Sequence, residues 1–423
     1  MDSAGSARPV APDPRGSASS ADVSGVARAV SFHGHEFSVP AGWRLVDLTR
    51  NPTACVRFDA HAVYFGTPSG DQRCPAANGT VVTGAVLVEP SSAATAASAV
   101  DNTLDQRISA TLPGVAIVAS YGTDRKSVVG LLAAAHVPAP TVAYPSTSTA
   151  AVAARATAKL SSIQGSVTPA TVASFTQVYT GLGFDACTAP STAQMTAWAG
   201  SPFGAVGVYI GGAGRACTQP NLTASWVAAE TGAGWRLLPV YVGPQIVFNK
   251  VTDAVTQGTA SADDAVTQAS ALGIGEGAVL YYDMEGGGYT ATQTTTAQQF
   301  LAAWTTELHA LRYRAAVYGS ETGALGAVMS GWGTVTEPDV IDVANWNGQS
   351  DDDPGADPAG HWRGHRVHQF ISSTDATYGG VTINIDEDFF ALAGPCGPAL
   401  PGTPVQPRYM INCAVSPAAA PSP

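Results

Sequence analysis

Apolar and polar positions alternate in two different ways along the second half of the chain. Short apolar runs are followed there by stretches with helical spacing, beginning with GFDAC and then TAQMTAWAG. Five such pairs precede three further strand candidates that have little helical sequence between them. Alternation of this kind predicts a parallel sheet, and eight strands predict closure. We therefore expect an α/β fold, a (β/α)8 TIM-like barrel with reduced late helices. An open doubly wound sheet is the alternative, although no glycine-rich cofactor motif supports it.

The first half of the chain predicts a separate and smaller unit. Strand-like runs such as CVRFDAHAVYFG and helix-like runs such as KSVVGLLAAAH occur together there. Three scattered histidines (His33, His35 and His61) are more readily explained by packing or exposure than by a metal site. The predicted division is a disordered leader over 1–28, a small mixed α/β domain of unknown role over 29–146, an Ala/Ser/Thr-rich linker over 147–175, the barrel over 176–395 and a Pro-rich tail over 396–423.

Charge and composition exclude several kinds of partner. The formal net charge is -12, charged residues make up only 12% of the chain, and the lysines are Lys126, Lys159 and Lys250. Because no basic stripe exists to follow phosphates, we expect no nucleic acid partner. No apolar run is long enough for a transmembrane segment. The N-terminal stretch lacks the apolar core of a signal peptide, so secretion is inferred from cysteines and composition.

The six cysteines form three pairs of neighbours along the sequence. None has C-x-x-C spacing, so zinc and thioredoxin-like sites are disfavoured. We expect disulfides within the pairs, although other pairings and buried reduced thiols remain alternatives. The expected pairs are Cys55 with Cys74, Cys187 with Cys217, and Cys396 with Cys413.

Polar side chains are concentrated where the predicted barrel strands end. The stretch YYDMEGG places Asp283 and Glu285 on one face of a strand, roughly 6.5–7 Å apart along the backbone. In a (β/α)8 barrel the carboxyl ends of the strands form the active site. Four carboxylates and several aromatic or amide side chains therefore converge on one mouth: Asp185, Asp283, Glu285 and Asp386, with Tyr209, Tyr241, Tyr318, Trp346 and Gln369.

Crowded carboxylates suit the cleavage of a glycosidic bond. That reaction needs a protonated acid beside the leaving oxygen and a carboxylate near the anomeric carbon. Neighbouring carboxylates raise one another's pKa, so one of them keeps its proton near neutral pH. We expect Glu285, which has the longer reach, to be the proton donor. Asp283, Asp185 and Asp386 are expected to orient the substrate and stabilise positive charge. Alternatives are helix capping or a calcium or magnesium site.

Residues of about 178–392 resemble the glycoside-hydrolase-like domain of secreted proteins from high-GC Gram-positive bacteria, catalogued as domain of unknown function 1906. The stretches that carry this resemblance are GFDAC, VGVYIGG, PVYVG, YYDME and GGVTINID. The pattern is more distantly similar to the family 25 lysozymes, whose opening G-[IF]-D and later D-x-E match Asp185, Asp283 and Glu285. That similarity implies that Glu285 is the general acid and that Asp283 assists it. It also assigns Asp386 to the same site.

Departures from the lysozyme pattern affect the expected substrate subsites. Asp388 stands where that family has Asn, and His368 replaces Trp. The resemblance also implies that Cys187 and Cys217 lie in adjacent loops at the mouth. We therefore expect a secreted glycoside hydrolase that acts on a bacterial cell-wall polysaccharide, with Asp388 among the substrate-binding residues and without a cofactor. A non-catalytic carbohydrate-binding barrel and a metal-assisted phosphodiesterase are the alternatives.

Overall fold

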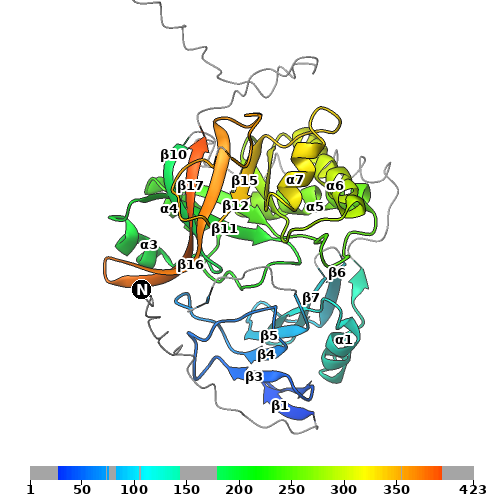
Figure 1. Ribbon diagram of the computed structural model, residues 1–423. Coiled ribbons are helices and arrows are strands. Elements are labelled where there is room, and N and C mark those ends of the chain that lie inside the picture. Colours follow the sequence, from blue (N-terminus) through cyan, green and yellow to red (C-terminus); the bar gives the residue numbers. More distant parts are fainter. Residues whose placement is uncertain are drawn as a thin grey trace, which may run out of the picture.

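The computed structural model describes residues 27–72, 74–75, 82–103, 106–142, 179–353 and 355–392. Two bodies are formed, with the blue and cyan one below the green-to-red one in Figure 1. The predicted linker over 147–175, the predicted tail and the cysteines Cys396 and Cys413 lie outside the described residues.

The N-terminal body is a seven-stranded mixed sheet with a two-stranded hairpin and a helix against it. The sheet order is β3-β4-β5-β8-β7-β6-β9. Its elements are β1 (Arg28–Phe32), β2 (His35–Val39), β3 (Arg44–Asp47), β4 (Ala62–Phe65), β5 (Ala85–Pro90), β6 (Ser98–Asn102), β7 (Arg107–Leu112), β8 (Val115–Ser120), α1 (Arg125–Ala134) and β9 (Thr141–Val142).

The alternation of side chains along these strands gives the sheet two apolar faces. One face carries Val86 and Val88 and is covered by α1, through Leu131 and Leu132, and by the β1–β2 hairpin. The opposite face carries Tyr64 and Leu87, which pack against residues from the segment between β3 and β4. Burial on both faces makes this unit a core of its own.

The second body is a closed eight-stranded barrel, ordered β10 to β17 along the chain. Its strands are β10 (Tyr179–Asp185), β11 (Phe203–Gly211), β12 (Arg236–Tyr241), β13 (Val279–Asp283), β14 (Arg314–Gly319), β15 (Val340–Ala344), β16 (His365–Tyr378) and β17 (Val381–Leu392). Its helices are α3 (Thr192–Trp198), α4 (Ala224–Gly232), α5 (Ala254–Ala271), α6 (Ala291–Ala310) and α7 (Ala324–Ser330).

The predicted (β/α)8 TIM-like barrel is wrong. Strands β10 to β16 run parallel to their neighbours, but β17 is antiparallel to both β16 and β10. Helices follow only the first five strands, and the described residues between β15 and β16 form none. The fold is therefore a mixed barrel and not a ring of alternating strand–helix units.

A two-residue turn explains the direction of the last strand. Gly379 and Gly380 join β16 to β17, with φ of 56° and 77°, and Tyr378 pairs with Val381. Positive φ at both turn positions is the geometry of a tight hairpin, which glycine adopts without strain. The Gly-Gly pair between two alternating segments was thus a sequence signal for an antiparallel pair.

Side chains of the barrel strands alternate between an inner and an outer core. The inner core includes Val279, Tyr281 and Phe390. The outer core lies between the strands and the helices, and there Tyr282 packs against Trp304 of α6, with ring centroids 5.0 Å apart. This period of two brings Asp283, the next inward residue after Tyr281, to the barrel axis at the strand end.

The N-terminal body packs on the loop that follows β11. The backbone N–H of Phe58 donates to Ala216 O (2.7 Å), and that of Thr218 donates to Val56 O (3.3 Å). The side chain of Asn221 donates to Gly70 O at 2.8 Å. Because this loop leaves the carboxyl end of a barrel strand, the N-terminal body lies beside the barrel mouth.

Candidate functional site

A cleft opens at the carboxyl ends of the barrel strands. It is lined by five aspartates and one glutamate, together with aromatic, amide and aliphatic side chains. The lining residues are Asp185, Tyr209, Leu238, Val240, Asp283, Glu285, Tyr318, Asp342, Trp346, Gln369, Asp386 and Asp388. No lysine, arginine or histidine from the described part of the chain is among them, so the carboxyl groups face one another without a counter-charge.

Gln369 connects four of these side chains. Its amide oxygen accepts from Tyr318 Oη and from Trp346 Nε1, each at 2.8 Å. Its amide nitrogen donates to Asp185 Oδ2 at 3.0 Å and to Asp386 Oδ2 at 3.4 Å. The two rim aromatics therefore orient the amide so that it donates to the acids behind it.

Asp185 at the end of β10 accepts two side-chain hydrogen bonds in the cleft. Besides the bond from Gln369, its Oδ1 accepts from Tyr209 Oη at 2.7 Å. Burial raises the pKa of Asp185, and these two hydrogen bonds oppose that rise. Burial and the neighbouring carboxylates also raise the pKa of Tyr209 well above its usual range, so this phenol keeps its proton and acts as a donor.

Asp283 and Glu285 line the same cleft, as their spacing predicted, but their surroundings differ. Asp283 is 6% exposed, and its buried Oδ1 has no hydrogen-bond partner among the described residues. Burial, reinforced by the charges of Glu285 and Asp185, raises the pKa of Asp283 well above its usual range. Glu285 is half-buried and thus reaches the open part of the cleft. An aspartic acid with a raised pKa therefore lies behind a more accessible glutamate.

Gln245, in the loop after β12, holds the strand end that carries both acids. Its amide oxygen accepts from the backbone N–H of Glu285 at 2.7 Å, and its amide nitrogen donates to Asp283 O at 2.8 Å. Pairing between β12 and β13 stops at Tyr241 and Tyr282. The side chain of Gln245 thus replaces a strand neighbour just where the ladder ends.

Two further acids lie deeper in the barrel. Asp342 of β15 is 4% exposed, and Asp388 of β17 is 3% exposed. Burial first, then the charge of Asp185, raises the pKa of each well above its usual range. Sequence reasoning missed Asp342, although a charged residue between Val340 and Ala344 on the inward face of the strand was a visible signal.

Asp386 occupies the other side of the mouth on β17. Burial and the charge of Asp185 raise its pKa to about 8, while a hydrogen bond from the backbone of Ser373 opposes the shift. Asp386 consequently holds its proton at neutral pH. This arrangement can donate a proton to a bound molecule without any basic residue.

The predicted aromatic residues divide into two groups. Tyr209 and Tyr318 line the cleft, and Trp346 stands at its edge with 55% of its surface exposed. Tyr241 lies elsewhere, because its side chain points outward and donates to Asp264 Oδ2 of α5 at 3.0 Å. Tyr241 is therefore a packing residue between the sheet and its helices and does not reach the mouth.

Two of the expected disulfides are present, Cys55–Cys74 and Cys187–Cys217. Among the described residues, the one group of three side chains close enough to hold a metal ion consists of sulfur atoms already in these disulfides. The three N-terminal histidines do not form such a group; His61, for example, pairs with Asp124 at 2.9 Å.

The comparison with protein families supports the sequence resemblance. Residues 196–390 match the family described as Rv2525c-like, glycoside hydrolase-like domain. This segment of the chain therefore matches the model of that family, as the resemblance predicted. It contains Asp283, Glu285 and Asp386, whereas Asp185 lies before its first residue.

Two solved structures illustrate the similarity. A crystal structure of an uncharacterized B. stearothermophilus protein is 19% identical, covers 49% of this chain and 95% of its own, and has a TM-score of 0.38. The Mycobacterium tuberculosis Tat-secreted protein Rv2525c, in complex with L-tartrate, is 14% identical, with coverages of 50% and 96% and a TM-score of 0.38. No curated protein matches the chain.

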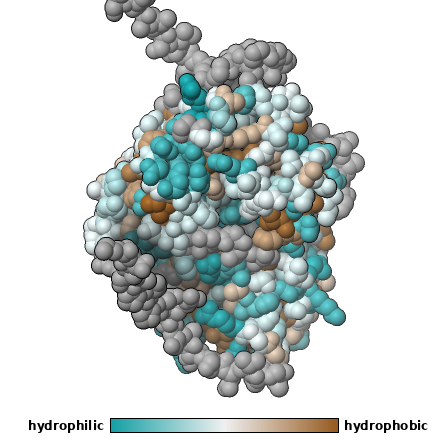
Figure 2. Space-filling view, viewed as in Figure 1, coloured by the Kyte–Doolittle hydropathy of each residue, from teal (hydrophilic) through white to brown (hydrophobic). Residues whose placement is uncertain are grey.

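None of the helices in the described ranges combines the length and the apolar character that crossing a membrane requires. On the face drawn in Figure 2, hydrophobic side chains occur in small separate patches among hydrophilic ones.

Proposed function

We propose that the protein is a secreted glycoside hydrolase that cleaves a cell-wall polysaccharide at the barrel mouth. The observation that carries this proposal is the pairing of the buried Asp283, whose pKa is raised, with the more accessible Glu285 on one strand end. Carbohydrate chemistry fits the remaining lining, because tyrosine and tryptophan rings pack on the apolar faces of sugars while amide and carboxyl groups bond to hydroxyls.

The proposed reaction begins with proton transfer from Glu285 to the glycosidic oxygen, as that bond breaks. Burial and the charge of Glu285 raise the pKa of Asp283, so Asp283 holds a proton that it can share with the donor Glu285. Asp185 stabilises the positive charge that develops at the anomeric carbon, and Asp386, whose pKa is raised to about 8, orients the substrate. Water then supplies a hydroxyl to that carbon and returns a proton to the carboxyl group, which completes hydrolysis.

Substrate binding is assigned to the rim of the cleft. Trp346 offers an exposed ring, while Tyr209, Tyr318 and Gln369 present groups that are already oriented by hydrogen bonds. Asp388 lies deeper in the cleft, where burial and the charge of Asp185 raise its pKa. The two disulfides agree with an oxidising compartment, which supports the proposal of secretion.

The test is release of soluble sugar or new reducing ends from purified bacterial wall fractions. We expect release by the wild type and a loss of roughly 10²–10⁴-fold in Glu285→Gln, the range attributed to general acids. Glu36→Gln, at an exposed position of β2, is the matched control and should keep full activity.

Other outcomes would contradict the proposal. Equal release by the wild type and Glu285→Gln would remove the assigned proton donor. If neither protein releases sugar but either one still sediments with a wall fraction, a carbohydrate-binding barrel would be favoured. Loss of activity on addition of a chelator would favour metal-assisted phosphodiester hydrolysis.

A further inference from the structure

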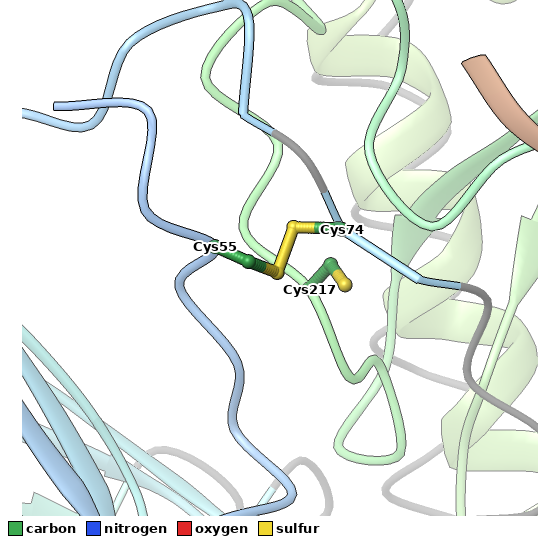
Figure 3. A group of neighbouring side chains, drawn as sticks. All are labelled: Cys55, Cys74 and Cys217. Atoms are coloured by element: carbon green, nitrogen blue, oxygen red, sulfur yellow. A yellow bond between two sulfur atoms is a disulfide. The ribbon is translucent and has the colours of Figure 1, made fainter. Parts of the chain in front are cut away.

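The two disulfides of the described residues meet where the two bodies touch. Cys55–Cys74 belongs to the N-terminal body, and Cys187–Cys217 joins the loops that follow β10 and β11. The sulfur atoms of Cys55, Cys74 and Cys217 all lie within 4.8 Å of one another. Figure 3 shows Cys217 beside the Cys55–Cys74 bond, although the three residues come from distant parts of the sequence.

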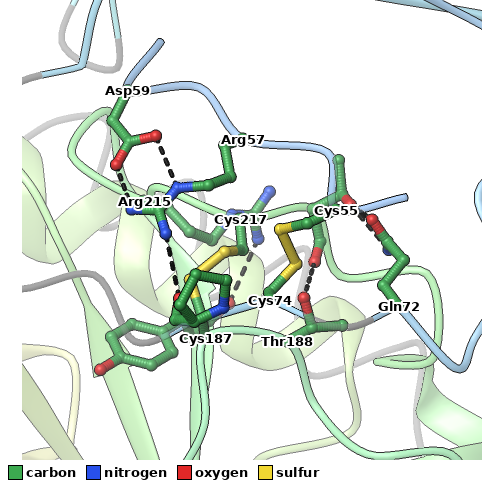
Figure 4. Close-up of a disulfide and its surroundings, with 12 residues drawn as sticks. Cys55, Arg57, Asp59, Gln72, Cys74, Cys187, Thr188, Arg215 and Cys217 are labelled. Atoms are coloured by element: carbon green, nitrogen blue, oxygen red, sulfur yellow. Dashed lines mark hydrogen bonds and ion pairs between the residues drawn. A yellow bond between two sulfur atoms is a disulfide. The ribbon is translucent and has the colours of Figure 1, made fainter. Parts of the chain in front are cut away.

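Backbone pairing holds the sulfur atoms in this arrangement. Arg57 and Cys217 form an antiparallel β-bridge, flanked by the hydrogen bonds of Phe58 with Ala216 and of Val56 with Thr218. Gln72 adds a side-chain link, because it accepts from the backbone of Val56 at 2.8 Å and donates to Thr218 Oγ1 at 3.1 Å. Proximity of the sulfur atoms is therefore built into the docking of the two bodies (Figure 4).

The four cysteines differ in their exposure to solvent. Cys217 is fully buried, Cys74 and Cys187 are 8% and 7% exposed, and Cys55 is half-buried. An external thiol therefore reaches Cys55 first. Attack on the sulfur of Cys55 would release the thiolate of Cys74, which faces Cys217 across the interface.

We infer that these four cysteines form a thiol–disulfide exchange site that takes a dithiol, either a small molecule or a protein with two thiols, as its reductant. The reductant attacks Cys55 and breaks the Cys55–Cys74 bond, and its second thiol then resolves the mixed disulfide and leaves as the oxidised reductant. The Cys74 thiolate attacks Cys217 and breaks the Cys187–Cys217 bond. The products are a Cys74–Cys217 disulfide and free thiols at Cys55 and Cys187, so two electrons have entered and one disulfide remains.

This exchange connects the N-terminal body covalently to the barrel. It also breaks the Cys187–Cys217 bond between the two loops at the mouth. Cys187 lies two residues after Asp185, and its carbonyl oxygen accepts from Gln219 Nε2 at 2.7 Å. In the oxidised form the loops after β10 and β11 are joined to each other. After exchange, the loop after β11 is joined to the N-terminal body instead, and the loop that carries Cys187 is released.

The test uses a variant that already contains the attacking thiol. In Cys55→Ser, Cys74 is left without its partner, and we expect it to displace Cys187 from Cys217. Folded protein is quenched with acid, its free thiols are alkylated and it is digested with trypsin. The four cysteines fall on four different tryptic peptides, because arginines at 57, 107 and 215 separate them. Mass spectrometry should then show linked Cys74 and Cys217 peptides, with the label on Cys187.

A second variant allows the same test if the first variant does not fold. Cys74→Ser leaves Cys55 as the free thiol, and since its sulfur also lies within 4.8 Å of that of Cys217, a Cys55–Cys217 link is expected. The linked fraction should not change on dilution, because the exchange is intramolecular. An intact Cys187–Cys217 bond in both variants, with the label on the unpaired N-terminal cysteine, would overturn the inference. Neither result depends on glycosidase activity.

Discussion

Asp342 shows what burial does to a single carboxyl group in this barrel. It is 4% exposed, its Oδ1 has no hydrogen-bond partner among the described residues, and burial raises its pKa well above the usual range. We expect Asp342→Asn to raise the free energy of unfolding by about 1 kcal/mol at pH 8. At that pH, folding requires the aspartate either to take up a proton or to be buried as an anion, and asparagine requires neither. At pH 4 the effect should be small. Urea unfolding at both pH values measures it; equal effects would show that ionisation is not the cause.

The acids together predict how stability changes with pH. Asp386 has a folded-state pKa of about 8, and burial raises the pKa values of Asp185, Asp283 and Asp388 as well. A raised pKa means that the folded protein binds protons more tightly than the unfolded chain. Stability from these groups is therefore complete below about pH 4 and is lost as the pH rises toward 8. The melting temperature should be higher at pH 5 than at pH 8.

A variant separates this effect from general charge repulsion. Asp386→Asn should flatten the change in melting temperature between pH 5 and pH 8, because it removes one of the groups that titrate there. The acids with lowered pKa, such as Asp339, act in the opposite sense, but only near and below pH 4. A melting temperature that rises from pH 5 to pH 8 would contradict the assignment.

At the scale of the elements, the end of β13 depends on one side chain from a neighbouring loop. Gln245 satisfies the N–H of Glu285 and the carbonyl of Asp283 where β12 no longer does. We expect Gln245→Ala to destabilise the protein by roughly 1–3 kcal/mol, because it leaves buried backbone groups without partners. If the proposed function is correct, kcat should fall more than KM changes.

The matched control for this prediction is Gln298→Ala. Gln298 also donates to a backbone carbonyl, Ala327 O at 3.0 Å, but it does so between α6 and α7. Its loss should lower stability and leave wall-glycan release unchanged. Equal losses of activity in both variants would show that Gln245 acts through stability alone and does not position the acids.

The same scale shows why the barrel was predicted with the wrong architecture. Hydrophobic alternation locates a strand and its buried face, and it located β13 and its two acids. It carries no information on whether the strand runs parallel or antiparallel to its neighbours. That direction came from the Gly379–Gly380 turn between β16 and β17, where alternation alone suggested one more parallel strand.

At the scale of the whole molecule, Asn221 joins three segments. Its side-chain amide donates to Gly70 O in the N-terminal body and to Ala189 O in the loop after β10, both at 2.8 Å. We expect Asn221→Ala to weaken the docking of the two bodies by about 1–3 kcal/mol, since two carbonyls lose their donor. Calorimetry should then show a broader or divided unfolding transition.

A residue of the same type provides the control. Asn384 donates to Asp375 at 2.8 Å within the exposed part of the β16–β17 hairpin. Asn384→Ala should leave the shape of the transition unchanged. If both variants unfold as the wild type does, the two bodies are held together by contacts other than those of Asn221.

The sequence by itself determined where strands and helices lie, which acids share a strand face, and which of the described cysteines pair. These features depend on a period of two or 3.6 and on short separations along the chain, which local physics enforces. The tertiary structure decided the rest: the antiparallel last strand, the inward position of Asp342, the outward position of Tyr241, the support from Gln245 and the meeting of two disulfides. The support from Gln245 and the meeting of the two disulfides depend on contacts between segments far apart in the chain, which no local pattern records. The last strand, Asp342 and Tyr241 had local signals, but the side each faces depends on which strands pair in the closed barrel.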